Sequence, residues 1–198
     1  VYDMMAEEAD LDECLVKNIQ DNLDVLPSDM NLAGAEIELV GVENRENCLK
    51  IALSKVKDDY DYIIIDCPPS LGLLTLNAFV CADTILIPIQ CEYYALEGLS
   101  QLIKTIRLVK KGLNPSLDIE GVLLTMFDAR TNLSIQVADE VKKYYPKKVY
   151  ASVIPRNVRL SEAPSYGQPI TVYDENSKGA ESYTKLANEV IERNEGVK

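Results

Sequence analysis

Histidine and tryptophan are both absent from the 198 residues of this chain. Without histidine, the chain has no Ser–His or Cys–His pair for nucleophilic catalysis, and it lacks the imidazole ligands common in zinc sites. The five cysteines form no CxxC pair, so neither a zinc site nor a disulfide framework is indicated. The chemistry that remains is that of carboxylates, hydroxyls, lysine, arginine and bound metal ions.

Segments that would direct the chain to a membrane are also missing. No apolar stretch is long enough to span a bilayer, and the first residues show no signal-peptide pattern. Because the cysteines are scattered and odd in number, we expect reduced thiols and a cytoplasmic location. The length is sufficient to bury a hydrophobic core, and we expect one domain over residues 1–198.

The formal net charge of −12 argues against non-specific nucleic-acid binding by the whole surface. The charge is uneven, however: residues 1–60 carry 15 acidic and 5 basic side chains, whereas residues 130–160 carry 2 acidic and 7 basic ones. The basic region is either a solvated helix face with a turn or a local anion-binding surface. Composition alone leaves both interpretations open.

Apolar runs of strand length alternate with periodic segments of helix length, which is typical of a parallel α/β sheet. The expected strands cover residues 22–26, 62–66, 84–90, 119–126 and 149–154. The expected helices cover residues 43–57, 73–81, 95–111, 134–145 and 179–193. We therefore expect an α/β fold, with a mostly parallel sheet flanked by helices on both faces. Tyr144 and Ile191 are expected on the buried faces of the last two helices.

The segment YIIIDCPPS, residues 62–70, is the most informative in the chain. Its aromatic and β-branched residues predict a fully buried parallel strand. The strand would end at Asp66, where open α/β sheets place their functional groups, and Pro68 and Pro69 would stiffen the following loop. A buried carboxylate here is suited to hold Mg²⁺ beside a nucleotide phosphate, as in the Walker B motif. Many α/β strands also end in aspartate for purely structural reasons.

A phosphate-binding loop of the form GxxxxGK(S/T) does not occur in the chain. In P-loop proteins this loop cradles the phosphates with its backbone N–H groups. Asp66 therefore predicts only half of a nucleotide site.

Three blocks of sequence together carry a resemblance to a known family. They are DYIIIDCPPS (61–70), PIQCEYYALEG (88–98) and IPRNVRLSEAP (154–164). In this order they strongly resemble the ParA/Soj chromosome- and plasmid-partitioning ATPases of the deviant-Walker group, which also contains MinD. The likeness extends over residues 1–193. Members begin with a strand, a KGGxGKT loop, a helix and a strand ending in a DxDPQ-type switch, so the resemblance implies a P-loop NTPase-like fold truncated at its N-terminus.

The resemblance implies that Asp66 is the Walker B aspartate, which positions Mg²⁺ beside ATP through a water molecule. It places Cys67, Pro68 and Pro69 in the switch II loop, which senses the γ-phosphate and remodels the dimer face. The deviant lysine and the switch I aspartate have no counterpart in the chain. We therefore expect the intact protein to hydrolyse ATP and these 198 residues alone to be inactive.

The resemblance also assigns Pro155, Arg156 and Asn157 to the segment that packs on adenine, largely through backbone. From the residues alone, a proline-ended strand and a turn is the preferred explanation of this segment. The loop at 92–94 (EYY) is either close to the dimer surface or an ordinary polar loop whose tyrosines pack on the core.

Arg130 and Arg159 are the predicted DNA contacts. Both follow expected strands in the basic region, and the family binds double-stranded DNA without sequence preference, through guanidinium–phosphate pairing. For Arg130, the alternative is a cap or salt bridge at the Asp128 turn.

The implied function is chromosome or plasmid segregation by an ATP-bound homodimer on DNA, with hydrolysis stimulated by a ParB-type partner. The expected location is the nucleoid of a bacterial-type cytoplasm. A MinD-like ATPase that cycles on a membrane is disfavoured, because no apolar face continues beyond Ile191. A catalytically inactive module that binds DNA or a partner is the third hypothesis, supported by the absence of a phosphate-binding loop.

Overall fold

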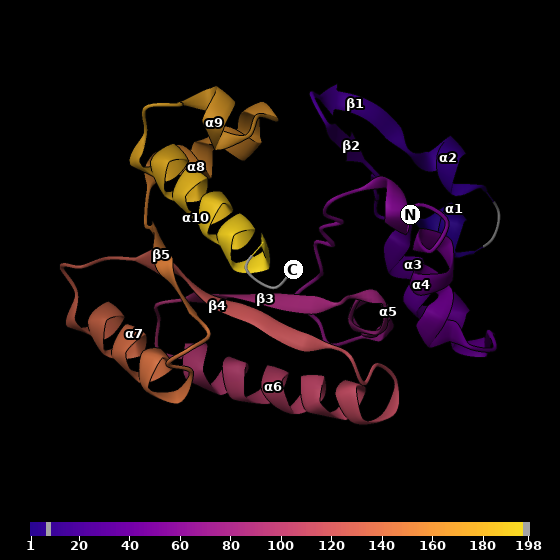
Figure 1. Ribbon diagram of the computed structural model, residues 1–198, viewed down its shortest axis with the longest axis horizontal. Helices are drawn as coiled ribbons and strands as arrows, with labels where there is room; N and C mark the ends of the chain where they lie inside the picture. Colours follow the sequence, from indigo (N-terminus) through magenta and orange to yellow (C-terminus); the bar gives the residue numbers. More distant parts are fainter. Residues whose placement is uncertain (7–8, 196–198) are drawn as a thin grey trace. The chain divides into compact units, whose positions relative to one another are not determined.

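The computed structural model describes residues 1–6 and 9–195, which form two compact units (Figure 1). The N-terminal unit comprises Val1–Asp83 and Thr105–Leu117, and the sheet unit comprises Thr84–Lys104 and Asp118–Lys198. Helix α6 (Ala95–Gly112) contributes residues to both. The assignment of residues 1–198 to a single domain stays a prediction.

The sheet unit is built on three parallel strands in the order β3-β4-β5. They are β3 (Thr84–Gln90), β4 (Asp118–Phe127) and β5 (Val149–Pro155). Helix α7 (Asn132–Tyr144) lies on one face of this sheet and α10 (Lys178–Glu195) on the other (Figure 1). The predicted α/β class, with a parallel sheet between helices, is confirmed.

Alternation along the strands sends apolar side chains to both faces of the sheet, as expected for a parallel sheet covered on both sides. On the α10 face, Leu123, Tyr150, Ile154 and Leu186 form one buried cluster. A short succession of turns follows β5: α8 (Val158–Glu162), η4 (Ala163–Tyr166) and α9 (Ile170–Tyr173). These turns enclose a second small cluster with the start of α10.

Glycine is required at position 121, where β4 and β5 approach closely. A Cβ atom there would lie 2.5 Å from Cε2 of Tyr150 and 2.8 Å from the backbone oxygen of Lys148. Because one of these neighbours is backbone, a side chain could be accommodated only by moving a strand.

The N-terminal unit consists of short elements around a core that includes Met4, Leu39, Leu49 and Ala78. Its helices are α1 (Tyr2–Met5), α2 (Leu11–Cys14), α3 (Leu32–Glu38), η1 (Leu39–Gly41), η2 (Arg45–Asn47), α4 (Cys48–Leu53), η3 (Lys57–Asp59) and α5 (Leu73–Cys81). Its strands β1 (Val16–Gln20) and β2 (Leu23–Val25) form an antiparallel hairpin.

Two buried asparagines join these short elements. Asn77 accepts a hydrogen bond from the backbone N–H of Leu49 and donates to the carbonyl oxygen of Arg45. Asn114 donates to the carbonyl oxygens of Phe79, Val80 and Ala82, at the end of α5. Side-chain amides thus satisfy backbone groups that the short helices leave unpaired.

The predicted buried strand at 62–66 is wrong. These residues are not assigned to any strand, Ile64 is 91% exposed, and Tyr62, Ile63 and Asp66 are exposed as well. The apolar run has the local preference for extended backbone, but among the described residues no strand pairs with it. Strand formation depends on cross-strand neighbours more than on intrinsic preference, so the preference alone was insufficient.

Three smaller expectations also differ from the structure. The helix predicted over 43–57 is reduced to α4 between two 3₁₀ turns, because Asn44 adopts a left-handed φ of 56° and the Ser54 hydroxyl donates to the carbonyl oxygen of Ile51. Tyr144 and Ile191, expected to face inward, are 65% and 41% exposed. The strand expected at 22–26 is present as β2, but it pairs antiparallel with β1.

Candidate functional site

The residues predicted to act on nucleotide and DNA lie in both units. Asp66, Cys67, Pro68 and Pro69 belong to the N-terminal unit, whereas the segment from Pro155 to Asn157, together with Arg130 and Arg159, belongs to the sheet unit. Within the sheet unit, the backbone N–H of Arg156 is bound to Phe127, close in sequence to Arg130, and Asn157 is bound to the backbone N–H of Arg159. No contact between Arg130 and Arg159 is present among the described residues.

In the N-terminal unit, the loop that begins at Asp66 leads into α5. The thiol of Cys67 donates to the carbonyl oxygen of Ile65 at 3.8 Å, and desolvation, followed by the charge of Asp66, raises the pKa of that thiol. At the other end, the buried hydroxyl of Thr75 donates to the carbonyl oxygen of Ser70 at 2.6 Å. The loop is therefore fixed at its ends, while Asp66, Pro68 and Pro69 are exposed between them.

The fit of Asp66 to Mg²⁺ depends on the kind of metal site. The part of the chain that the structure describes contains no group of three or more acidic, cysteine or histidine side chains placed to hold a metal. Magnesium beside a nucleotide is commonly bound by one or two carboxylates, water and phosphate oxygens, and the single exposed carboxylate of Asp66 fits that arrangement.

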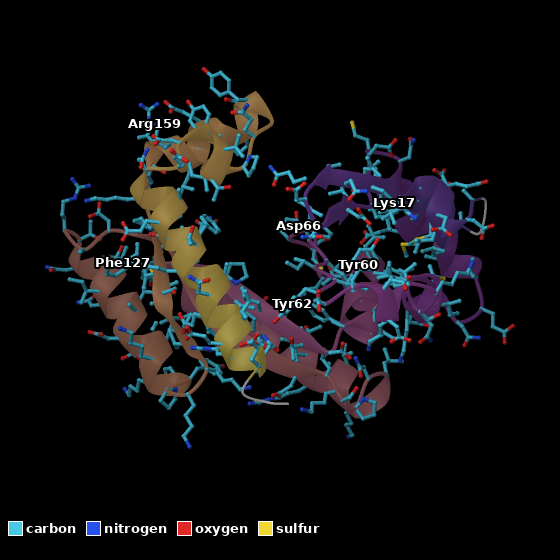
Figure 2. All side chains as sticks on the ribbon, turned by 45° about the horizontal axis from the view of Figure 1, so that its top comes forward. Lys17, Tyr60, Tyr62, Asp66, Phe127 and Arg159 are labelled. Carbon is cyan, nitrogen blue, oxygen red and sulfur yellow. The ribbon has the colours of Figure 1, made fainter. Side chains whose placement is uncertain are left out.

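Tyr60, two residues before the 62–66 segment, is bound to the β1–β2 hairpin by a contact that no sequence pattern indicates. Its hydroxyl donates to Oδ2 of Asp24 at 2.5 Å, and the backbone N–H of Asn18 donates to Oδ1 of the same carboxylate. The hydrogen bond to Asp24 raises the pKa of Tyr60 to about 12. Tyr60, together with Tyr62 and Asp66 at the two ends of this segment, is labelled in Figure 2.

Glu36 lies against the end of the Asp66 loop. Its Oε1 atom is buried without a hydrogen-bond partner among the described residues, and it would clash with any Cβ atom at Gly72, the N-cap residue of α5. Glycine at position 72 thus leaves the space that the Glu36 carboxylate occupies.

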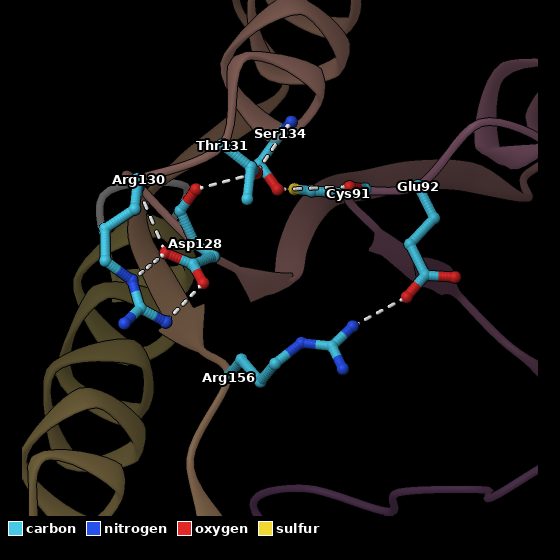
Figure 3. Close-up of polar contacts among 7 residues, drawn as sticks. All are labelled: Cys91, Glu92, Asp128, Arg130, Thr131, Ser134 and Arg156. Atoms are coloured by element: carbon cyan, nitrogen blue, oxygen red, sulfur yellow. Dashed lines mark hydrogen bonds and ion pairs between the residues drawn. The ribbon is translucent and has the colours of Figure 1, made fainter.

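In the sheet unit, the loops at the carboxyl ends of β3, β4 and β5 are joined by hydrogen bonds (Figure 3). The backbone N–H of Cys91 donates to the carbonyl oxygen of Thr125, and that of Arg156 donates to the carbonyl oxygen of Phe127. The hydroxyl of Ser134, on α7, donates to the carbonyl oxygen of Cys91 at 3.2 Å. In open α/β sheets, ligands bind beyond this edge.

The segment predicted to pack on adenine is held at this edge. Pro155 is the last residue of β5, and Oδ1 of Asn157 accepts a hydrogen bond from the backbone N–H of Arg159, capping α8. The guanidinium of Arg156 donates to Oε1 of Glu92 at 2.7 Å (Figure 3). Glu92 therefore positions Arg156. No local pattern indicates this pairing, because the two residues are 64 positions apart.

The two tyrosines after Glu92 are not packed on the core. Tyr93 and Tyr94 are 74% and 75% exposed, and their rings meet edge to face with centroids 5.1 Å apart. The interpretation of this loop as a polar turn with buried tyrosines is therefore wrong. Its proximity to a dimer surface stays a prediction.

Arg130 lies in the turn between β4 and α7. Its Nε and Nη2 donate to the two oxygens of Asp128 at 2.9 and 2.7 Å, and its backbone N–H donates to Oδ1 at 3.0 Å (Figure 3). These hydrogen bonds lower the pKa of Asp128 far below its usual range. The salt bridge considered for this turn is present, yet the Arg130 side chain is still 88% exposed.

Met126, just before this turn, has a left-handed φ of 52° and lies where the β4–β5 register shifts. A bulky side chain rarely adopts this backbone conformation. β4 ends one residue later, at Phe127, and Asp128 lies beyond the strand.

Arg159, the other predicted DNA contact, is in α8 and also pairs with carboxylates. Its Nη1 donates to Oε2 of Glu162 at 2.9 Å, and its Nε lies 3.3 Å from Oδ2 of Asp174. Oε2 of Glu162 also accepts a hydrogen bond from the hydroxyl of Tyr173. The Arg159 side chain remains 55% exposed, and it is labelled in Figure 2.

The helices give no indication of a bilayer span: over residues 1–6 and 9–195, none combines the length and the apolar character that crossing would need.

Known proteins are similar to this chain over nearly its whole length. A family model described as an AAA domain (AAA_31) matches residues 1–119. The sporulation initiation inhibitor protein Soj of Bacillus subtilis is 64% identical over 190 residues, which are 96% of this chain and 75% of that protein. The chromosome partitioning protein ParA of Myxococcus xanthus is 55% identical over 193 residues, 98% of this chain and 68% of that protein.

Among solved structures, cobyrinic acid a,c-diamide synthase from Mycobacterium smegmatis, with bound ADP and magnesium, is similar with a TM-score of 0.83 and 34% identity. The match covers 100% of this chain and 73% of that one.

Proposed function

Because this chain belongs to the ParA/Soj family of chromosome-partitioning ATPases, we propose that it uses ATP and Mg²⁺ to control its binding to DNA. The ATP-bound form is a homodimer that binds duplex DNA without sequence preference, and a ParB-type partner stimulates hydrolysis. The observation that carries this proposal is the polar edge at the carboxyl ends of β3, β4 and β5, from which Arg130 extends into solvent. The ADP and magnesium in the similar synthase structure support a nucleotide at this type of fold.

In this proposal, each of the candidate residues has a separate role. Asp66 would hold Mg²⁺, and the bound ion would neutralise phosphate charge. Cys67, Pro68 and Pro69 respond to the γ-phosphate, because their loop begins at Asp66 and leads directly into α5. The segment from Pro155 to Asn157 packs on adenine, held at the edge by the Arg156 N–H bond to Phe127. These 198 residues contain no GxxxxGK(S/T) loop to cradle the phosphates.

The metal role of Asp66 is tested by replacing it with Ala in the protein expressed from its complete coding sequence. MgATP hydrolysis should fall about 100-fold or more, since a metal ion contributes several kcal/mol to phosphoryl transfer. Asp61→Ala removes another exposed carboxylate five residues earlier and should leave the rate unchanged. Normal hydrolysis by Asp66→Ala would overturn the assignment. If the unmodified protein bound DNA but did not hydrolyse ATP, it would be an inactive binding module.

The DNA face is tested by replacing Arg130 and Arg159 with Ala and titrating a mixed-sequence duplex by fluorescence anisotropy at several salt concentrations. Each variant should weaken binding, and the slope of log affinity against log salt should shrink by about 0.9 per lost phosphate contact. Arg107→Ala, an exposed arginine on α6, is the matched control and should bind as the unmodified protein does. An unchanged affinity in the double variant would place the DNA surface elsewhere.

A further inference from the structure

Both arginines predicted to contact DNA are already paired with carboxylates. Arg130 makes a two-pronged contact with Asp128, and Arg159 contacts Glu162 and Asp174. A guanidinium and one carboxylate together carry no net charge, and two carboxylates leave a net negative charge. As folded, neither arginine therefore offers an uncompensated positive charge to a phosphate.

At the first site, the carboxylate is better anchored than the arginine. Asp128 is 18% exposed, accepts the backbone N–H of Arg130, and has its carbonyl oxygen bound by the N–H and hydroxyl of Thr131. Arg130, at 88% exposure, is free to turn toward a phosphate, but Asp128 cannot turn away. Three of the five guanidinium N–H donors are also left for another acceptor.

At the second site, the carboxylates come from two elements. Glu162 ends α8 and also accepts the hydroxyl of Tyr173, whereas Asp174 follows α9. Their side chains are 39% and 32% exposed. A phosphate approaching Arg159 therefore meets two negative charges, compared with one at Arg130.

We propose that Asp128, Glu162 and Asp174 are positioning residues that hold Arg130 and Arg159 in exposed ion pairs and so set DNA affinity below the value that the arginines alone would give. Exposed ion pairs are weak, so a phosphate can displace them and binding is attenuated but not blocked. The effect should be largest at Arg159, which has two such neighbours. This inference rests on the proposed function, because it takes both arginines to be DNA contacts.

The test measures duplex affinity and its salt dependence for Asp128→Asn, Glu162→Gln and Asp174→Asn in the protein expressed from its complete coding sequence, with ATP present. Each amide keeps the shape and an oxygen acceptor but removes the charge. Affinity should rise about threefold to tenfold for Glu162→Gln and less for Asp128→Asn, with a steeper salt slope in each case. Unchanged affinity and slope in all three would overturn the inference.

Two comparisons separate this inference from its alternatives. Glu181→Gln removes the same charge from an ion pair with Lys185, which includes neither arginine, and should change affinity little. An equal gain in this variant would show that only the net charge matters, and would overturn the inference. In an Arg159→Ala background, Glu162→Gln should lose most of its effect, as expected for coupled residues. If Arg159→Ala and Arg130→Ala alone left affinity unchanged, the proposed DNA face would fail instead.

Discussion

Two apolar runs in this chain have a similar preference for β structure, but only one of them forms a strand. Residues 84–90, TILIPIQ, form β3, pair along their length with β4, and bury Ile87 and Ile89. Residues 62–65, YIII, have no strand partner within the described ranges 1–6 and 9–195, and Ile64 is 91% exposed. A run of β-branched residues is thus only a candidate strand, and a paired neighbour makes it one.

The difference extends to the functional groups at the ends of the two runs. Glu92, beyond β3, is held in an ion pair with Arg156 by loops that the sheet aligns. Asp66 ends a run that no strand pairs with among the described residues. Its position depends on contacts on either side, such as the hydrogen bonds of Tyr60 and Thr75. In open α/β sheets, functional groups lie beyond the carboxyl ends of the strands. The positions of such groups are set by the sheet only where the strand before them is paired.

The difference in burial between the two runs is tested most directly by truncating an isoleucine in each. Ile87→Ala should lower the free energy of unfolding by about 2–5 kcal/mol, because it opens a cavity at a side chain that is 3% exposed. Ile64→Ala should change it by less than about 0.5 kcal/mol, because the side chain is already in water. Urea unfolding followed by circular dichroism measures both. A loss at Ile64 as large as that at Ile87 would mean that the 62–65 run is buried in solution.

A second experiment sharpens the role of strand pairing itself. Gly121→Ala should cost about 1–3 kcal/mol, since the new methyl group would press on Tyr150 and on the backbone oxygen of Lys148 and separate β4 from β5. Gly98→Ala, in α6 with open space around it, should instead stabilise by up to about 1 kcal/mol. The unfolding temperature should fall for Gly121→Ala and rise for Gly98→Ala. Equal shifts in the two variants would contradict the close approach of β4 and β5 at Gly121.

The smallest expected effect concerns the hydrogen bond that tethers the unpaired run. The Tyr60 pKa is raised to about 12 in the folded chain, chiefly by Asp24, against about 10 for an unperturbed tyrosine. The stabilisation is therefore complete below pH 10 and is lost as the pH rises from 10 to 12. Tyr60→Phe lacks it at every pH, so the stability difference between the two proteins should be constant from pH 8 to 9.5 and shrink above pH 10. A difference that stays constant up to pH 11.5 would argue against the tether.

Much of the fold could be predicted from periodicity. The run at 84–90 and the helix at 73–81 have the predicted bounds, and the segments around 119–126, 149–154 and 179–193 agree within a few residues. These elements bury a face whose spacing matches the secondary structure, so local pattern and tertiary packing agree. In the N-terminal unit, α1, α2 and α3 were missed because helices of 4, 4 and 7 residues are too short to show a periodic apolar pattern.

The sequence by itself determined the chemistry and the family. The lack of histidine limits the reactive groups, and the three blocks around Asp66, Glu92 and Arg156 identify the relatives. Only the tertiary structure decided which groups meet. Glu92 reaches Arg156 across 64 positions because parallel strands bring their carboxyl ends to one edge, and Asp174 reaches Arg159 because α8 and α9 fold together. Pairing between distant segments is not encoded by a local pattern. Residues 62–66 lie outside the sheet because, among the described residues, no strand pairs with them.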